Sequence, residues 1–168
     1  MSGFQKVFAD ALGSVSAVGS TLPAGAKLGS VKVMPNGDEY VLCYNASNQQ
    51  ISKGFACARN QGSAAAAGPY SVTVTTVTET AYGAVGMVVH ATATTGTYFW
   101  ALRENVGSAV AFVGVTAVAA AGGATLQLAA NGQFTNGTTQ AVGYVVTSGT
   151  TATLSGAAYV NFKRQFTQ

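Results

Sequence analysis

Charged residues are scarce in this sequence. Asp, Glu, Lys and Arg make up 8% of the 168 residues, against about 25% in ordinary globular domains. Eight basic and five acidic residues give a formal net charge of +3, and only Lys163 and Arg164 stand side by side as a basic pair. A nucleic-acid surface needs a basic stripe, so we expect no nucleic-acid partner. Because so few charges protect the surface against association, we expect other chains to cover much of it.

Side chains that perform catalysis are almost as rare. His90 is the single histidine, and neither Cys43 nor Cys57 stands at ligand spacing from another metal-ligating residue. Nucleophile elbows, phosphate-binding loops and dinucleotide-binding turns are missing. We therefore expect a structural or surface role for His90, no metal, no cofactor and no enzyme activity. One alternative stays open, namely a glycosidase pair assembled from Glu79 and Glu104 by tertiary contacts.

Long apolar runs are missing too. No segment has the roughly 18 uninterrupted apolar residues of a transmembrane helix, and the first residues lack the basic-then-apolar pattern of a signal peptide. We expect synthesis in a cytoplasm and no membrane partner. Cys43 alternates with apolar neighbours within Tyr40–Tyr44, which predicts a reduced, buried thiol. Whether it pairs with Cys57 stays open.

What the sequence does contain is β-branched and aromatic residues between Gly-rich turns. Turn signals at intervals of about 8–12 residues are typical of an all-β fold, so we predict an antiparallel β-sandwich or a small β-barrel. Met34–Asp38 combines Pro with Asn-Gly and predicts a tight hairpin turn. In Thr97–Arg103, the aromatic residues Tyr98, Phe99 and Trp100 offer the largest apolar surface and are expected in the core. The predicted strands are Ser30–Val33, Glu39–Tyr44, Ile51–Arg59, Tyr70–Thr80, Met87–Ala91, Thr97–Arg103, Ala109–Val113, Ala124–Leu128, Gln133–Thr135, Gln140–Thr147, Thr151–Leu154 and Ala157–Lys163.

The first 29 residues differ from the rest. Phe4, Val7, Phe8 and Leu12 fall on one face at helical spacing, and Gly13 should end that helix. A helix this short is marginal in water without a surface to lie on. We predict an extended, partly helical arm over residues 1–29 and a single β-domain over residues 30–168. The arm docks either on its own domain or on a neighbouring subunit.

Several segments resemble the small structural proteins of tailed-bacteriophage heads. Gly96–Gly107, which follows Tyr82–Gly86, shows their glycine-led aromatic strand that ends in a polar residue and turns at a glycine. Ala119–Leu126, Gln140–Val145 and Ala158–Phe162 are similar to their glycine turn, Ala-Val-Gly strand and closing Val-x-Phe strand. The likeness is to head decoration, or cement, proteins. It implies a compact β-domain, often trimeric, seated on the outside of the shell.

This resemblance implies a virion structural protein on the capsid exterior, made in a bacterial host. We expect it to bind the major capsid protein as a homotrimer and to stabilise the assembled shell by adding buried interface. Capsid contacts are expected from the apolar face of the arm, at Phe4, Val7, Phe8 and Leu12. Contacts between subunits are expected from an uncharged strand face at Val72, Val74, Thr76 and Thr78.

Two other functions stay open. A tail, neck or fibre component would share this composition. A carbohydrate-binding β-module would use Trp100 or Tyr98 as a platform on which sugars stack, and it would display an exposed row of aromatic side chains.

Overall fold

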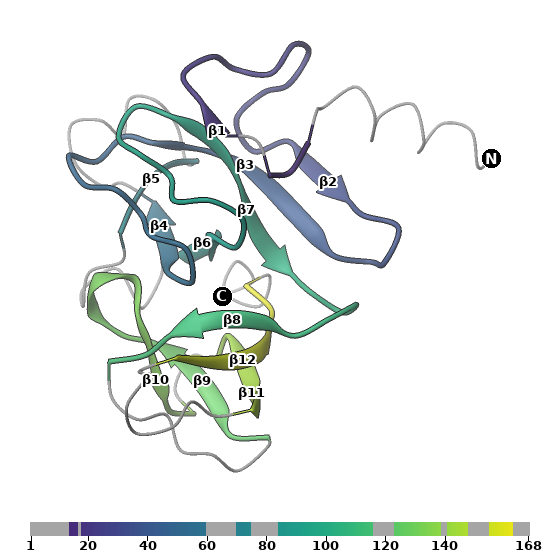
Figure 1. Ribbon diagram of the computed structural model, residues 1–168, viewed down its shortest axis with the longest axis vertical. Coiled ribbons are helices and arrows are strands. Elements are labelled where there is room, and N and C mark those ends of the chain that lie inside the picture. The colour runs from purple at the N-terminus through teal and green to yellow at the C-terminus, as the bar shows by residue number, and fades with distance from the viewer. Residues whose placement is uncertain are drawn as a thin grey trace.

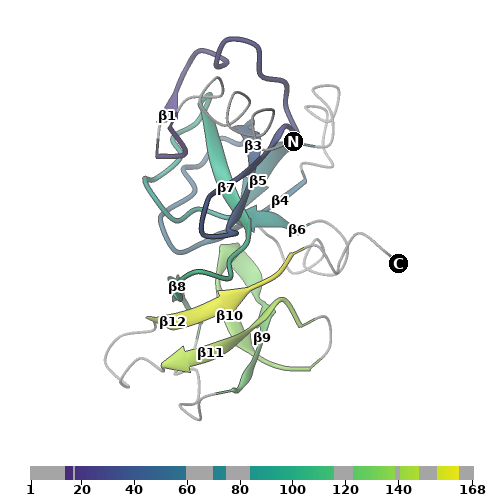
Figure 2. The ribbon, with the colours of Figure 1, turned by 90° about the vertical axis from the view of Figure 1, so that its right-hand side faces the viewer.

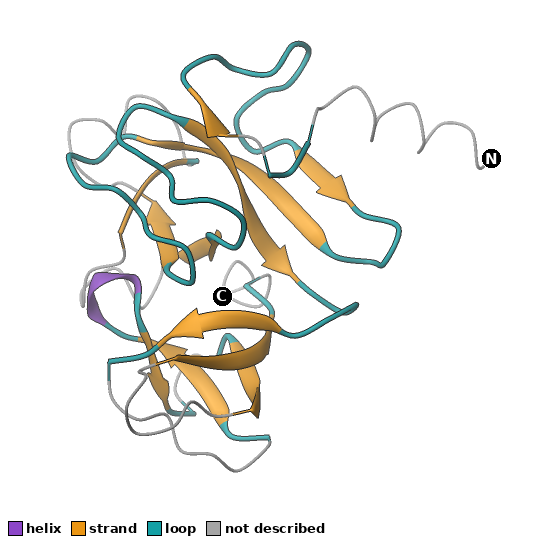
Figure 3. Cartoon of the chain, viewed as in Figure 1, coloured by secondary structure: helices purple, strands orange, loops and turns teal. Residues whose placement is uncertain are grey.

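The chain folds into two lobes made almost entirely of β-strands (Figures 1 and 2). Strands β1 to β7 form the first lobe and β8 to β12 the second. Figure 3 shows how little of the described chain is helical. The all-β prediction is confirmed, and within the described part no helix is long and apolar enough to cross a membrane. This computed structural model describes residues 14–16, 18–59, 70–74, 84–115, 123–138, 141–147 and 155–162.

Five strands of the first lobe close into a ring. Neighbours around the ring are β3, β7, β6, β4 and β5, all antiparallel except for the parallel pair that β5 makes with β3. Two short strands, β1 and β2, extend the sheet from β7 and β3. The bounds are β1 Val18–Gly19, β2 Val31–Val33, β3 Glu39–Asn45, β4 Ala56–Arg59, β5 Ser71–Val74, β6 Ala84–Met87 and β7 Tyr98–Glu104.

The β3–β7 pair is buried on both faces. Both strands carry near-continuous apolar runs, so alternate side chains enter two different cores. Val41, Cys43, Phe99 and Ala101 join the small core inside the ring. The opposite faces of the two strands join the larger core that reaches the second lobe, through Tyr40, Leu42, Trp100 and Leu102.

The second lobe is one antiparallel sheet in the order β10-β9-β11-β12-β8. A bridge between Gly114 and Phe134 brings the end of β8 to β10, at the other side of this sheet. Asn131 and Gly132 both take positive φ in the turn η3, as the Asn-Gly signal predicts. The bounds are β8 Val110–Val113, β9 Thr125–Leu128, η3 Ala130–Gly132, β10 Phe134–Asn136, β11 Gly143–Thr147 and β12 Ser155–Val160.

Some strands and turns have the bounds that the sequence predicts, and others differ because of hydrogen bonds between distant segments. The hairpin turn at Met34–Asp38 is confirmed, with the Met34 N–H donating to Asp38 O at 2.8 Å. The predicted strand Met87–Ala91 is wrong beyond its first residue: Val88 instead bonds in both directions to the turn at residues 52–55. The break predicted between the strands Thr151–Leu154 and Ala157–Lys163 is also wrong, because Ser155 and Gly156 pair with β8 and begin β12.

The amino-terminal part of the described chain contributes to the first lobe. Val18 and Gly19, which fall within the predicted arm, pair with Phe99 and Tyr98 of β7. Ala26 is buried in the larger core. The predicted helical stretch with Phe4 and its neighbours lies outside the described residues.

Candidate functional site

The three central aromatic side chains differ in exposure. Phe99 and Trp100 are buried, with 2% and 3% of their surface exposed. Tyr98 is half-buried, and its ring packs against Tyr44 with 4.9 Å between centroids. Trp100 therefore has no free face for a sugar, so the carbohydrate-binding alternative loses one of its two candidate platforms.

The strand face proposed for subunit contacts is only partly described. Val72 is fully buried inside the ring and offers no side chain to a neighbouring subunit. Val74 is half-buried against the same core. Thr76 and Thr78 lie outside the described residues, as do all the arm residues proposed to contact a capsid, Phe4, Val7, Phe8 and Leu12.

Both cysteines are buried free thiols inside the ring, as predicted for Cys43. Burial raises the pKa of the Cys43 thiol, and the neighbouring Cys57 thiol raises it further. Since the thiolate is the reactive form, burial and the raised pKa both disfavour reaction at Cys43.

His90 and the described acids have structural partners. The His90 ring stacks on Tyr40, with 5.4 Å between centroids, and its Nε2 lies 3.2 Å from the Tyr40 hydroxyl. Asp38 is buried and accepts the backbone N–H groups of Val106 and Gly107 with Oδ1. Among the described residues no three His, Cys, Asp or Glu side chains gather where they could hold a metal. Glu79, one member of the proposed glycosidase pair, lies outside the described residues.

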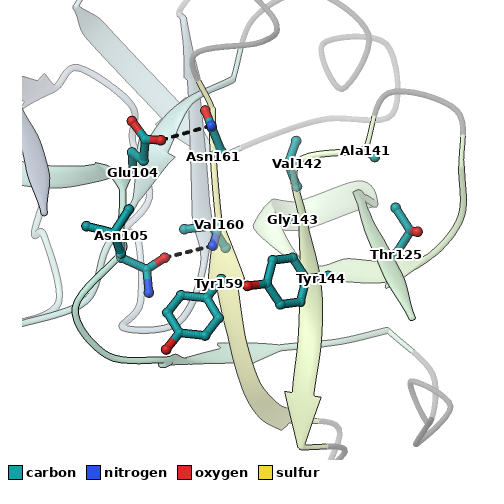
Figure 4. Close-up of a pocket in the computed structure, with 11 residues that line it drawn as sticks. Glu104, Asn105, Thr125, Ala141, Val142, Gly143, Tyr144, Tyr159, Val160 and Asn161 are labelled. Atoms are coloured by element: carbon teal, nitrogen blue, oxygen red, sulfur yellow. Dashed lines mark hydrogen bonds between the residues drawn. The ribbon is translucent and has the colours of Figure 1, made fainter. Parts of the chain in front are cut away.

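A groove of about 600 Å³ lies where the end of β7 meets β11 and β12 (Figure 4). Gly143 allows the two strands to approach closely, because a Cβ at this position would overlap the backbone of Tyr159. The buried side chains of Val142 and Val160 form the floor. The full lining is Glu104, Asn105, Val106, Thr125, Ala141, Val142, Gly143, Tyr144, Tyr159, Val160 and Asn161.

Two tyrosines form one wall of the groove. Tyr144 and Tyr159 are direct cross-strand partners, so their side chains emerge on the same face of the sheet. Their ring centroids are 5.4 Å apart with 36° between the ring planes, and Tyr144 is 50% exposed. Figure 4 shows the two rings side by side at the mouth of the groove.

The opposite wall holds the polar groups and ties the lobes together. Asn105 is buried, accepts the Val160 N–H at 2.7 Å, and donates to Ser108 O at 2.6 Å. Beside it, the Asn161 side chain donates to Glu104 Oε1 at 3.1 Å. These bonds join the end of β7 to β12 across the junction.

Sequence reasoning missed this site. Alternation within β11 would have placed Tyr144 on the face opposite to the buried Val145. However, its neighbour Tyr159 follows only from the register of β11 against β12, and Glu104 only from the packing of one lobe on the other.

Comparisons with known proteins bear on the fold. No protein-family model matches the chain, and no curated protein sequence matches it. Among solved structures, the chain is similar to the N base of the head fiber gp8.5 of bacteriophage phi29, with a TM-score of 0.50 and 10% sequence identity. The likeness covers 73% of this chain and 93% of that chain. At this identity the similarity is one of fold alone.

Proposed function

We propose that this protein is a structural component of a bacteriophage head that binds the outer surface of the assembled shell. The observation that supports this best is the likeness in fold to the N base of a phage head fiber, which extends over 93% of that chain. The low charge of the sequence agrees with a surface that other chains cover. Bound to the shell, such a protein would stabilise it by mass action, because it binds the assembled form alone.

Strand β2 is where we place the contact with a neighbouring copy in a homotrimer. Hydrogen bonds from Met34 N to Asp38 O and from Leu42 N to Ser30 O set its register against β3. In that register the N–H and C=O groups of Val31 and Val33 face away from β3, toward the outer edge.

Strand β2 also exposes two apolar side chains. Val31 and Val33 are 41% and 54% exposed, whereas the intervening Lys32 is buried. A short edge strand and an inward-pointing charge both discourage the pairing of strands along an edge. The surface that β2 offers a neighbouring copy is therefore the exposed apolar face of Val31 and Val33, with packing of side chains as the contact.

Light scattering and co-sedimentation with empty, undecorated heads test the proposal. We expect a trimer that pellets with heads and not with purified tails. Val33→Lys should yield a folded monomer, whereas Val146→Lys, at an exposed valine of β11, should remain trimeric. A protein that ignores heads, or that pellets only with tails, would overturn the proposed function.

The arm is tested separately from the β2 edge. Deleting residues 2–13 removes Phe4, Val7, Phe8 and Leu12. If these residues contact the major capsid protein, the shortened chain should keep its oligomeric mass and lose co-sedimentation with heads. Head binding at full strength would show that the arm is not the capsid contact.

A further inference from the structure

The two lobes differ in where their strands carry charge. Within the described strands, β8 to β12 contain no Asp, Glu, Lys, Arg or His. The charged residues of the described strands all belong to the first lobe, and they are Lys32, Glu39, Arg59, Arg103 and Glu104. An antiparallel sheet with one face in water normally turns polar side chains to that face. The outer face of the second-lobe sheet departs from this pattern, because apolar side chains are exposed on it.

Strand register defines this outer face. On β11, Val145 points into the larger core, so Tyr144 and Val146 on either side of it point outward. These two side chains are 50% and 39% exposed. Cross-strand pairing places the outward side chains of the neighbouring strands beside them. We call this surface the uncharged face, and its members are Ala111, Thr125, Tyr144, Val146, Ala157 and Tyr159.

The size of the uncharged face indicates which kind of partner it fits. Five strands lie side by side in this sheet. At about 4.8 Å between strands and about 3.3 Å per residue, strands of about four residues form a patch of about 300 Å². A stable interface between two proteins buries about 800 Å² on each partner. The uncharged face is therefore too small to hold two copies together in solution by itself.

A shell offers what a single partner does not. Because it is built from many copies of one subunit, it repeats the same site, and a trimer can place three small patches on it at once. After the first patch has bound, binding of the others is intramolecular, so three weak contacts give one strong attachment. The matching area of the shell should also be uncharged, since a charge buried against the uncharged face would find no partner on it.

The position of the uncharged face agrees with this arrangement. Strand β2, where we place the contact between copies, belongs to the first lobe, and the uncharged face belongs to the second. Figure 1 shows the two lobes one above the other along the longest axis of the molecule. One lobe can thus join neighbouring copies while the other lies on the shell. Building on the proposed function, we propose that the uncharged face seats each copy on an uncharged, apolar and hydroxyl-bearing area of the head shell, alongside the contact made by the arm.

Co-sedimentation with empty, undecorated heads over a range of protein concentrations tests this. Val146→Lys and Ala111→Lys place a charge on the uncharged face from two different strands. Each should raise the concentration needed for half-saturation of the heads about tenfold or more, because a charge is buried without a partner in every copy of the trimer. Val146→Leu keeps an apolar side chain and should bind nearly as well as the parent protein.

Leu22→Lys is the matched control. Leu22 lies in the first lobe, is 37% exposed against 39% for Val146, and gains the same charge. This variant should bind heads like the parent protein. Light scattering and circular dichroism should show that all four variants remain folded trimers.

The possible failures are distinguishable. Full-strength head binding by both Val146→Lys and Ala111→Lys would overturn this inference and leave the proposed function standing. Equal weakening by Leu22→Lys would also overturn it, because the effect would then be one of added charge in general. Loss of the trimer in Val146→Lys would show that the face joins copies of this chain instead. A parent protein that does not pellet with heads would overturn the proposed function and this inference with it.

Discussion

The two lobes bury their strands in different ways. In the first lobe, Tyr40–Cys43 and Phe99–Leu102 are buried residue after residue, since both faces of β3 and β7 are covered. In the second lobe, β9 alternates strictly, with Leu126 and Leu128 buried and the intervening Gln127 half-exposed. The first lobe therefore has a core of its own, and it also supplies one side of the core on which the second lobe depends.

The composition of the two cores fits this division. The core inside the ring is built from small side chains, with Phe99 as its largest fully buried member. The larger core holds Phe112, Phe134 and Phe162, and it includes Trp100 from the outer face of β7. A change on that outer face should thus disturb the second lobe more than the ring.

Trp100→Ala should remove packing on which the second lobe depends, and we expect it to lower the free energy of unfolding more than any other change proposed below. Removing a buried aromatic ring costs about 3–5 kcal/mol of unfolding free energy. Urea unfolding measures the loss, and hydrogen exchange should rise first at second-lobe amides such as Val145, before Cys43 of the ring. The exposed Val106→Ala should change stability by no more than about 0.5 kcal/mol. Equal exchange in both lobes would refute the dependence.

Gly143→Ala should disturb the second lobe alone. The added Cβ would overlap backbone atoms of Tyr159 and Val160, which cannot move aside without separating β11 from β12. We expect a loss of about 3 kcal/mol in urea unfolding. Gly19→Ala is the matched strand control, because a Cβ there meets nothing within 4 Å. A Gly143→Ala protein as stable as that control would contradict the packing of β11 on β12.

Asn105→Ala should loosen the junction between the lobes. The change leaves the Val160 N–H and the Ser108 carbonyl without the partners they have at 2.7 and 2.6 Å. A buried polar group left unpaired costs about 2 kcal/mol. Differential scanning calorimetry should show a lower, broader transition, while Asn136→Ala, at an exposed asparagine of β10, should melt like the parent. An unchanged transition would show that the lobes do not depend on Asn105.

Local patterns were sufficient for part of this fold. The hairpin joining β2 to β3 follows from Pro35 and Asn36-Gly37, whose turn conformation is set within a few residues, including φ of +90° at Gly37. The strand β7 matches its predicted range within a residue, because its aromatic run is bounded by turn residues on both sides.

The rest depends on contacts between distant residues. Ser155 and Gly156 have turn propensity, yet pairing with Val113 and Phe112 makes them the start of a strand. The same holds for the groove: Tyr144 gains its partner Tyr159 from strand register, which no local pattern encodes.

The effect of pH on the free energy of unfolding should be smaller than that of the three substitutions above, and it should come from His90 in the first lobe. Partial burial, followed by the charge of Lys53, lowers the pKa of His90 from its ordinary value of 6.5. Below that value the unfolded chain binds a proton more readily than the folded protein, so unfolding free energy falls as the pH drops through 6.5. The fall stops once the pH is below the lowered pKa of the folded protein, where both states are protonated.

Comparison with His90→Gln isolates this contribution from the carboxylates that titrate at lower pH. Urea midpoints measured between about pH 7.5 and about pH 5 should fall more steeply for the parent protein than for the variant. The amide of Gln can keep a hydrogen bond to the Tyr40 hydroxyl, so the two proteins should be similarly stable at the upper end of the range. If their midpoints instead run parallel over the whole range, the His90 ring is not disfavoured in its charged form, and its stacking on Tyr40 leaves it open to water.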